Sequence, residues 1–503
     1  MNLLTLTLCL PLVGAICIGL FPLKGREAYW AALTASILML LCTLRIAWIF
    51  QDALPEGDSL FRLVEFYPWF PDLNLSYKVG IDGISLTLLI LTSIVTVAAV
   101  GVSAHVEESP RTFFAGLLLI SAGAFGAFIS LDLMLLYIFH ELALIPTFLL
   151  IGFWGSSTYR ERVATKLTIY LTAGSLLLLI GLLAFYFLLP PNIRTFDMEA
   201  LRLSLSAPNA PTGLILRSHE LWVYPLILFG FGILISLFPF HTWAPQGYAN
   251  APTAVAMLHA GVLKKFGLYG IIRVSQVFLP FGAMSYWMDV LAVLLLCNII
   301  YVGYVAMAEK DMNYMLGFSS VSHMGYIFLG IISHTLIGIS GAIFLMFAHG
   351  LTASLGFAIS GYVYRKTGTR DMTQLGGLAK SMPFMAVLFG MVAFASAGLP
   401  GFGNFAAEIL IFFGAWDKHR VVTIIALWGV VISSVYMLRA FRNVFLGDLK
   451  PTQDPASVIT MSYIERLPYL LLISVLVIIG FCPSLLLNLI KPGVEQWFVL
   501  IGK

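Results

Sequence analysis

Residues 251–270 read APTAVAMLHAGVLKKFGLYG, and two adjacent lysines, Lys264 and Lys265, interrupt an apolar run that extends to residue 279. The run is long enough to cross a lipid bilayer, which takes about 20 helical residues. A charged side chain at mid-bilayer costs about 2.5–3.5 kcal/mol on insertion scales, so such a residue faces a partner, water or an ion path. This stretch therefore predicts a membrane helix whose ionisable groups are functional.

The composition of the whole chain agrees with a membrane protein. Of its 503 residues, 60% are hydrophobic and 11% are charged, and the mean hydropathy is +0.94. Soluble domains carry about 25% charged residues, so a secreted enzyme, a nucleic-acid binder and a disordered scaffold are not expected. The net charge of +3 indicates no polyanionic partner. The five cysteines form no C-x-x-C pair, so neither an iron–sulfur cluster nor a zinc site of that kind is expected.

Apolar runs fill most of the chain, and the connectors between them are mostly short. We therefore predict an all-α polytopic membrane protein with about 14 transmembrane helices. The two longer connectors, 51–78 and 190–219, are predicted to be surface loops with short amphipathic pieces. A modest excess of Lys and Arg on one side places both termini on the non-cytoplasmic side. The runs cover residues 2–22, 29–50, 79–104, 112–130, 132–155, 166–189, 220–239, 251–279, 284–307, 312–333, 335–363, 381–416, 421–446 and 465–490.

The fifth run carries a carboxylate, Glu141, within YIFHELALIP at residues 137–146. Tyr137 lies four residues earlier on the same helical face and can hydrogen-bond it. Pro146 has no N–H, which leaves the Leu142 carbonyl free one turn away. We expect Glu141 to exchange protons; the alternative is a neutral, hydrogen-bonded structural glutamate.

In the run that carries the two lysines, Gly261 and Tyr269 lie four residues either side of Lys265 and share its face. The glycine is expected to open space and the tyrosine to offer a polar cap. A lysine removed from water can lose and regain its proton, so Lys265 is a candidate proton carrier. Lys264 points about 100° away and is interpreted as an anchor that reaches to the membrane surface.

Two further runs each carry a histidine with a hydroxyl within helical reach. Ser319 lies four residues before His323, and Thr352 lies three residues after His349. A mid-membrane histidine is often only a hydrogen-bonded tie between helices. In a chain that also carries Glu141, a proton relay becomes the favoured hypothesis.

Two segments break the helical pattern with Gly and Pro. The first is FPFHTWAP at 238–245, and the second is GLPGFGNFAAE at 398–408, in which Glu408 follows on the resumed helix with Asn404 one turn before it. Irregular backbone at membrane depth persists only where it is buried in protein or faces water. One broken helix in each half of a chain is typical of an inverted-repeat transporter. No redox centre, nucleotide loop or nucleophilic triad can be recognised.

The chain resembles the antiporter-like membrane subunits of respiratory complex I, in particular the subunit M (chain 4) family of NADH:quinone oxidoreductase. The resemblance covers nearly the whole chain. The matching motifs are GIDGIS at 80–85, HELALIP at 140–146, FPFHTWAP at 238–245, APT at 251–253, AGVLKKFGLYG at 260–270, SSVSHMG at 319–325, AHGL at 348–351, GTRDM at 368–372 and GLPGFGNFAAE at 398–408.

The resemblance implies fourteen helices that contain two inverted five-helix repeats, each with a broken helix. Residues 1–110 would hold helices 1–3, 111–280 the first repeat, 281–446 the second, and 447–503 a loop and helix 14. It also implies an energy-transducing membrane, such as the bacterial inner membrane, and homologous L-type and N-type subunits as neighbours. Quinone, flavin and iron–sulfur clusters would belong to partner subunits, with no cofactor in this chain.

Roles for single residues also follow from the resemblance. Glu141 would be the carboxylate of a first half-channel, and Lys265 the central lysine. His323 and His349 would be the connecting relay, and Glu408 the acid of a second half-channel. Asp82 and His241, which lie in two of the matching motifs, are further candidates.

The sequence departs from the family pattern beside Glu141. The family usually has a lysine five residues before the proline of FPFH, and this chain has Leu234. Two histidines, His140 and His259, stand where the family generally has Trp and an apolar residue. One of them, or Lys264, is the hypothetical replacement for the missing cation. The alternative is a divergent relative with weakened coupling.

These observations favour a proton-translocating, non-redox subunit of a quinone oxidoreductase that uses NAD(P)H or ferredoxin. Two alternatives stay open. One is a subunit of a multi-subunit cation/proton antiporter, and the other is a structural membrane-arm subunit that has lost transport.

Overall fold

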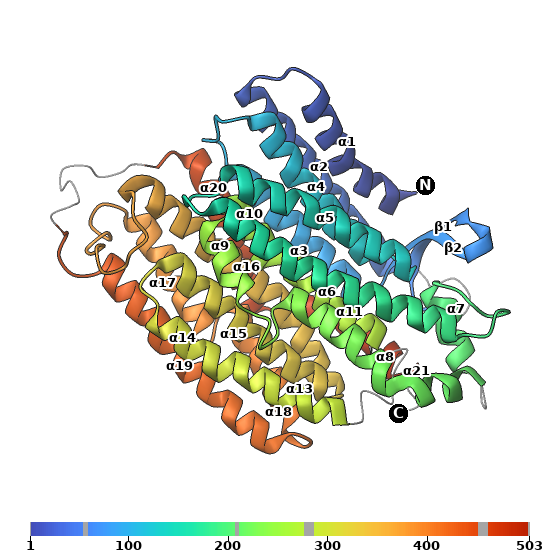
Figure 1. The fold of residues 1–503 in the computed structure, drawn as a ribbon. Helices are drawn as coiled ribbons and strands as arrows, with labels where there is room; N and C mark the ends of the chain where they lie inside the picture. The colour runs from blue at the N-terminus through green and yellow to red at the C-terminus, as the bar shows by residue number, and fades with distance from the viewer. Residues whose placement is uncertain (1, 54–58, 207–210, 276–285, 451–460, 501–503) are drawn as a thin grey trace.

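The computed structural model describes residues 2–53, 59–206, 211–275, 286–450 and 461–500. Its long helices run side by side in one bundle (Figure 1). The elements are α1 (Leu3–Leu20), α2 (Gly25–Asp52), β1 (Arg62–Phe70), β2 (Leu75–Ile81), α3 (Gly83–Gly101), α4 (Pro110–Ile129), α5 (Leu133–Trp154), α6 (Arg160–Leu188), α7 (Met198–Ser206), α8 (Pro211–Ile235), α9 (Trp243–Asn250), α10 (Thr253–Leu258), α11 (Lys264–Gly270), α13 (Tyr286–Leu296), α14 (Val302–Ala308), α15 (Met312–Ile332), α16 (Leu336–Thr367), α17 (Pro383–Ser396), α18 (Gly403–Trp416), α19 (Arg420–Phe445), α20 (Tyr463–Phe481) and α21 (Ser484–Leu500).

Twelve of the described helical segments are long and apolar enough to cross a membrane. They confirm the predicted all-α polytopic fold. Three shorter apolar helices, Leu221–Ile235 within α8, α17 and α18, occupy the two remaining predicted runs, 220–239 and 381–416. The count of fourteen crossings stays a prediction, and residues 276–279 and 284–285 of two predicted runs lie outside the described residues.

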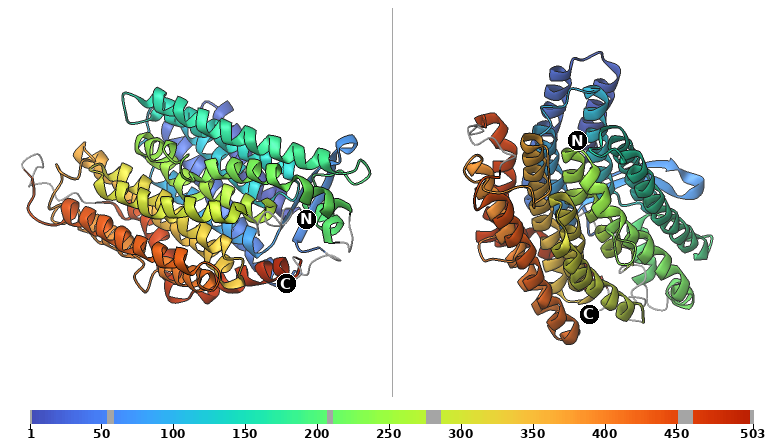
Figure 2. Two further views of the ribbon diagram at one scale, coloured as in Figure 1. Left: turned by 60° about the horizontal axis from the view of Figure 1, so that its bottom comes forward. Right: turned by 60° about the vertical axis from the view of Figure 1, so that its left-hand side comes forward.

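The core of the bundle is made by α16 and the segment Thr253–Val274, whose most apolar stretches are fully buried, with α15 nearly as enclosed. By contrast, α1, α2, α19 and α20 expose long apolar faces. The ribbon of α19 lies at the edge of the bundle in both views of Figure 2. Outward apolar faces suit lipid. The central helices, which carry most of the candidate residues, are therefore screened from lipid by other helices.

The connector 51–78 is not the loop that the sequence predicted. Its second half belongs to an antiparallel hairpin of β1 and β2, which lies beside α7 at one end of the bundle (Figure 1). Lys78 on β2 makes ion pairs with Asp197 (2.7 Å) and with Glu199 of α7 (2.8 Å). Burial opposes the charge of Lys78, but these two carboxylates outweigh it and raise its pKa. The connector 190–219 likewise contains α7 and the first turns of α8.

The two halves of the chain share a backbone feature. Asp132 caps the start of α5 and bridges to Asp197, and Asp311 caps the start of α15 and bridges to Asp371. In each half the bridge joins the residue before one helix to the loop that follows the next helix. Four candidate spans and the shorter apolar helix Leu221–Ile235 separate the two starts. If all five cross the membrane, the bridges lie at opposite ends of the bundle. Two inverted repeats require this arrangement.

Both predicted breaks are present. α8 ends at Ile235 and α17 ends at Ser396, and turns lead from them to α9 and α18. A second kind of irregularity was not expected from the sequence. The segment Thr253–Val274 contains two π-helical turns, and the first of them, η2 (His259–Leu263), ends directly before Lys264.

Candidate functional site

Both lysines of the central segment are fully buried. Lys264 Nζ lies 4.9 Å from the ring centroid of Tyr248 and 3.5 Å from Ser320 Oγ on α15. The interpretation of Lys264 as a surface anchor is therefore wrong, because its amine turns into the bundle. Lys265 Nζ donates to the Ala260 carbonyl at 2.6 Å, which lies inside the π-helical turn η2.

The two residues expected to serve Lys265 have other roles. A Cβ on Gly261 would overlap Ser354 Oγ, so the glycine allows α16 to pack closely against η2 rather than opening space. Tyr269 OH donates to the Phe128 carbonyl on α4 at 3.1 Å. The predicted tyrosine cap over Lys265 is therefore wrong, because its hydroxyl is committed elsewhere.

The two relay histidines meet in the centre of the bundle. His349 Nε2 lies 3.2 Å from Ser320 Oγ, the same hydroxyl that Lys264 approaches. The rings of His349 and His323 stack with their centroids 4.9 Å apart. Lys264, Ser320, His349 and His323 therefore form one continuous series of contacts, which we call the central series.

The hydroxyls predicted to accompany the histidines bond elsewhere. His323 Nδ1 lies 2.8 Å from the backbone oxygen of Ser319, whose Oγ accepts from Tyr436 OH at 2.8 Å. Thr352 Oγ1 donates to the Ala348 carbonyl at 2.9 Å. Both predictions named residues on the same helix as the histidine, whereas Ser320 reaches His349 from the neighbouring helix.

A polar contact leads from α16 toward Glu408. Thr352 Oγ1, one turn beyond His349, also lies 3.0 Å from Asn404 Oδ1 of α18. Asn404 lies one turn before Glu408, which is 4% exposed. A Cβ on Gly398 would lie 2.7 Å from Glu408 Oε2, so the break between α17 and α18 accommodates this carboxyl group.

Glu141 lies apart from this centre, on α5. The Ser175 hydroxyl of α6 donates to Glu141 and lies 2.9 Å from Tyr137 OH. Tyr137 also hydrogen-bonds Glu141, as the sequence predicted, and Ser175 contacts both residues. His140 Nδ1 lies 3.6 Å from Glu141 Oε1, and the His140 ring stacks on Phe266 with the centroids 4.2 Å apart. The Glu141 side chain is 34% exposed, unlike Lys265, the two relay histidines and Glu408.

Two of the further histidines lie near the lysines. His259 Nδ1 is 3.3 Å from Tyr248 OH, so His259 and Lys264 both contact Tyr248. His241, in the first break, stacks on Phe238 with the ring centroids 5.5 Å apart. Both are buried.

Asp82 has a different position. It forms a buried ion pair with Arg273 and accepts from the Ser85 backbone N–H at 2.9 Å, which caps α3. The pair ties the end of the segment Thr253–Val274 to α3. The geometry therefore supports an anchoring role for Asp82, and Arg273 is a partner that the sequence analysis missed.

Several buried polar atoms of this region have no hydrogen-bond partner among the described residues. Buried groups of this kind usually bond to water. They therefore mark where water can complete a hydrogen-bonded path. The atoms are His140 Nδ1, His241 Nδ1, His259 Nε2, His349 Nδ1, Asn404 Nδ2 and Tyr326 OH.

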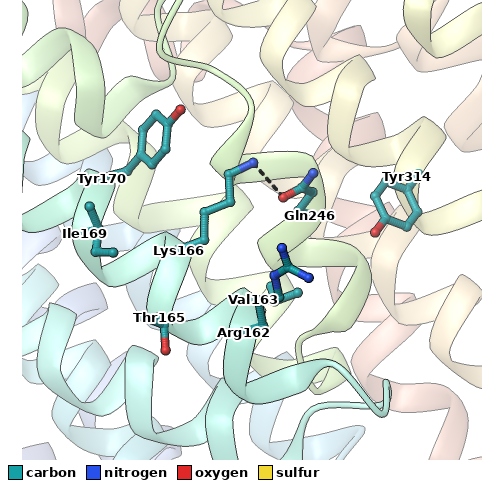
Figure 3. Close-up of a pocket in the computed structure, with 8 residues that line it drawn as sticks. All are labelled: Arg162, Val163, Thr165, Lys166, Ile169, Tyr170, Gln246 and Tyr314. Atoms are coloured by element: carbon teal, nitrogen blue, oxygen red, sulfur yellow. Dashed lines mark hydrogen bonds between the residues drawn. The ribbon is translucent and has the colours of Figure 1, made fainter.

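A surface pocket of about 720 Å³ opens where the first turns of α6 meet α9 and α15 (Figure 3). Lys166 extends from α6 and donates to Gln246 Oε1 at 2.8 Å, and the Arg162 guanidinium lies beside this pair. In the sequence, these two cations served only to predict the orientation of the chain in the membrane.

Residues 130–433 match the family described as NADH:quinone oxidoreductase/Mrp antiporter, transmembrane. The chain is 36% identical over 458 residues to the NAD(P)H-quinone oxidoreductase chain 4-2 of Synechocystis sp., which covers 89% of this chain and 79% of that relative. It is 32% identical over 510 residues to the NADH-quinone oxidoreductase subunit M of Rickettsia felis, with 99% and 98% covered. A chain of respiratory complex I from Thermus thermophilus with bound NADH has a TM-score of 0.87 at 27% identity, with 99% and 100% covered.

The matched residues include both breaks, both lysines, the relay histidines and both candidate carboxylates. The curated relatives extend the likeness over most of the chain. The chain belongs to the NADH:quinone oxidoreductase/Mrp antiporter family of membrane proteins.

Proposed function

We propose that this chain is the M-type (chain 4) membrane-arm subunit of a proton-pumping NAD(P)H- or ferredoxin-linked quinone oxidoreductase. It translocates protons and carries no electrons itself. The central series is the observation that carries the proposal, because it joins Lys264, Ser320, His349 and His323 by contacts of 3.2 to 4.9 Å in the buried core. Ionisable groups buried inside a membrane protein cost free energy, and a chain that carries them usually uses them for transport.

In this proposal Glu141 loads the first half-channel and Lys265 is the central proton carrier, which exchanges protons with the central series at the adjacent Lys264. His323 and His349 relay the proton, and Glu408 feeds the second half-channel. Transport of one charge against 100 mV takes about 2.3 kcal/mol. The free energy reaches this chain from a redox arm through neighbouring L-type and N-type subunits, and the flavin, iron–sulfur clusters and quinone belong to partners.

His140 is the best-supported replacement for the missing family lysine at Leu234. Among the three candidates, it is the one whose side-chain nitrogen lies within 4.0 Å of a Glu141 oxygen, whereas His259 and Lys264 contact Tyr248. The imidazole is buried and its Nδ1 lacks a hydrogen bond. A protonated imidazole there stabilises the carboxylate, and loss of that proton releases it.

The test is to measure protons moved per quinone reduced in the complex, with Glu141→Gln and Lys265→Ala each introduced into this chain. We expect proton yield to fall while quinone reduction persists. Glu107→Gln, at an exposed loop position, is the control and is expected to pump as the parent does. Normal proton yield in both site variants contradicts the assigned roles and favours a structural subunit.

The second candidate is a subunit of a cation/proton antiporter, since the matched family includes such proteins. Two measurements separate the candidates. Co-purification of flavin and iron–sulfur polypeptides supports the oxidoreductase. Sodium-dependent proton movement without a redox substrate supports the antiporter.

A further inference from the structure

The pocket at the start of α6 offers hydrogen-bond donors and positive charge with no carboxylate in its lining. Lys166 and Arg162 supply the charge, and the Lys166 amine uses one of its three protons on Gln246. Tyr314 OH accepts from Asn250 Nδ2 at 3.4 Å, which leaves its own proton to donate. Such a set of donors matches an anion with several oxygen atoms.

The placement of these cations does not help the helix on which they lie. Cations in the first turns of a helix oppose its dipole, which favours negative charge there. Tyr159, the residue before α6, makes no side-chain cap, although Ser157 accepts from the N–H groups of Tyr159 and Arg160. The remaining N–H groups of the first turn add to the positive potential, which Glu161 offsets in part. Arg162 has no ion pair among the described residues. An anion bound in the pocket would offset the two cations, accept from the N–H groups of the first turn and pair with Arg162.

A line of exposed apolar side chains runs down α6 from the pocket. Ile169, Leu176, Ile180 and Phe187 are each more than half exposed. At 100° per residue, these four positions lie within about 40° of each other on the helix surface, and Arg162 falls on the same line. A headgroup bound at Arg162 therefore has a continuous apolar track directly below it.

We propose that this pocket is a binding site for the phosphate of an anionic phospholipid, whose acyl chains lie along the line Ile169, Leu176, Ile180 and Phe187. Basic pockets between transmembrane helices on the cytoplasmic side bind such headgroups, and Arg162 and Lys166 lie on the side predicted to be cytoplasmic. The inference is independent of the proton path.

The test compares the intact complex that carries R162Q/K166Q in this chain with one that carries K24Q/R26Q. The control removes two cations near the start of α2, on the same predicted side, and outside the pocket. After detergent washing, lipids retained are counted by mass spectrometry, and the affinity for added phosphatidylglycerol is measured by titration. We expect one phosphatidylglycerol fewer, or about 30-fold weaker binding at this site, in R162Q/K166Q only.

The remaining outcomes each decide the question. The exchange R162K/K166R keeps both charges and is expected to retain the lipid; equal loss there contradicts capture by charge. Equal retention of phosphatidylcholine and phosphatidylglycerol overturns the proposal, as does displacement of the lipid by 10 mM inorganic phosphate. If R162Q/K166Q releases a neighbouring subunit with the lipid count unchanged, the pocket is a protein interface. Proton yield is recorded in parallel, so failure of this proposal leaves the proposed function separately testable.

Discussion

At the scale of single residues, the ionisable positions could be found from the sequence, but most of their partners could not. Glu141, Lys265 and the two histidines stand out because charge is rare in apolar runs. Ser320 and Ser175 do not, because serine is common in membrane helices and their importance depends on which helix packs beside them. Tyr137, guessed from helical spacing, does hydrogen-bond Glu141. The hydroxyls guessed in the same way for Lys265 and the two histidines bond elsewhere.

His140→Phe tests the pairing inferred at this scale. The substitution keeps the stacking partner for Phe266 and removes the group beside Glu141. We expect proton yield to fall several-fold in the intact complex. Adding Leu234→Lys to that variant is expected to restore it, because lysine returns to the position where the family carries one.

The rescue by Leu234→Lys is the decisive measurement. No rescue of the proton yield in the double variant would count against a charged role for His140.

At the scale of elements, apolar length predicted the long helices, and Gly and Pro predicted both breaks. The hairpin of β1 and β2 was missed because its residues alternate irregularly and lie in a polar connector. The π-helical turns were missed because no residue type marks them. The repeat left a signal that could have been found: Asp-Met recurs at 197–198 and 371–372, where each half of the chain bridges back to a capping aspartate.

Asp132→Asn tests the buried carboxyl group that caps α5. Burial raises the pKa of Asp132 to about 6, above its ordinary 3.8, although backbone N–H groups oppose the rise. The folded protein therefore retains a proton that the unfolded chain has lost between about pH 4 and 6. Stability falls as pH rises through that window, by about 3 kcal/mol. Thermal midpoints of the purified protein from pH 4 to 7 measure this effect.

In Asp132→Asn that fall is expected to disappear, because an asparagine can cap α5 without titrating. Asp72→Asn, at an exposed position, is the control and is expected to keep the fall. An unchanged pH dependence in Asp132→Asn would assign the effect to other groups.

At the scale of the whole molecule, the arrangement of the helices buries the central series and leaves Glu141 partly exposed. The central series lies on helices that other helices enclose, whereas Glu141 lies on α5 near the surface. Composition alone predicted a membrane bundle. The three most enclosed spans are somewhat less apolar than the peripheral ones, but α3 is almost as enclosed and as apolar as the peripheral helices. Apolar character alone therefore does not identify the central helices.

The positions of the termini are a prediction at this scale. The start of α1 and the last described helix, α21, lie toward the same end of the bundle (Figures 1 and 2). The distribution of Lys and Arg places that end outside the cytoplasm. Reporter fusions at either terminus are expected to be inactive if the reporter works only in the cytoplasm. Cytoplasmic activity from either fusion would reverse the proposed orientation.

The π-helical turn before the lysines has a consequence for how this site can change. Such a turn accommodates one extra residue while the helix on either side keeps its packing direction. The acceptor that Lys265 uses, the Ala260 carbonyl, lies inside this extra loop of backbone. Deleting one residue from the turn would therefore remove the Ala260 carbonyl from the reach of Lys265, while the helix keeps its packing against its neighbours. A relative with the same side chains but a shorter turn would hold its central amine differently, through chain length alone.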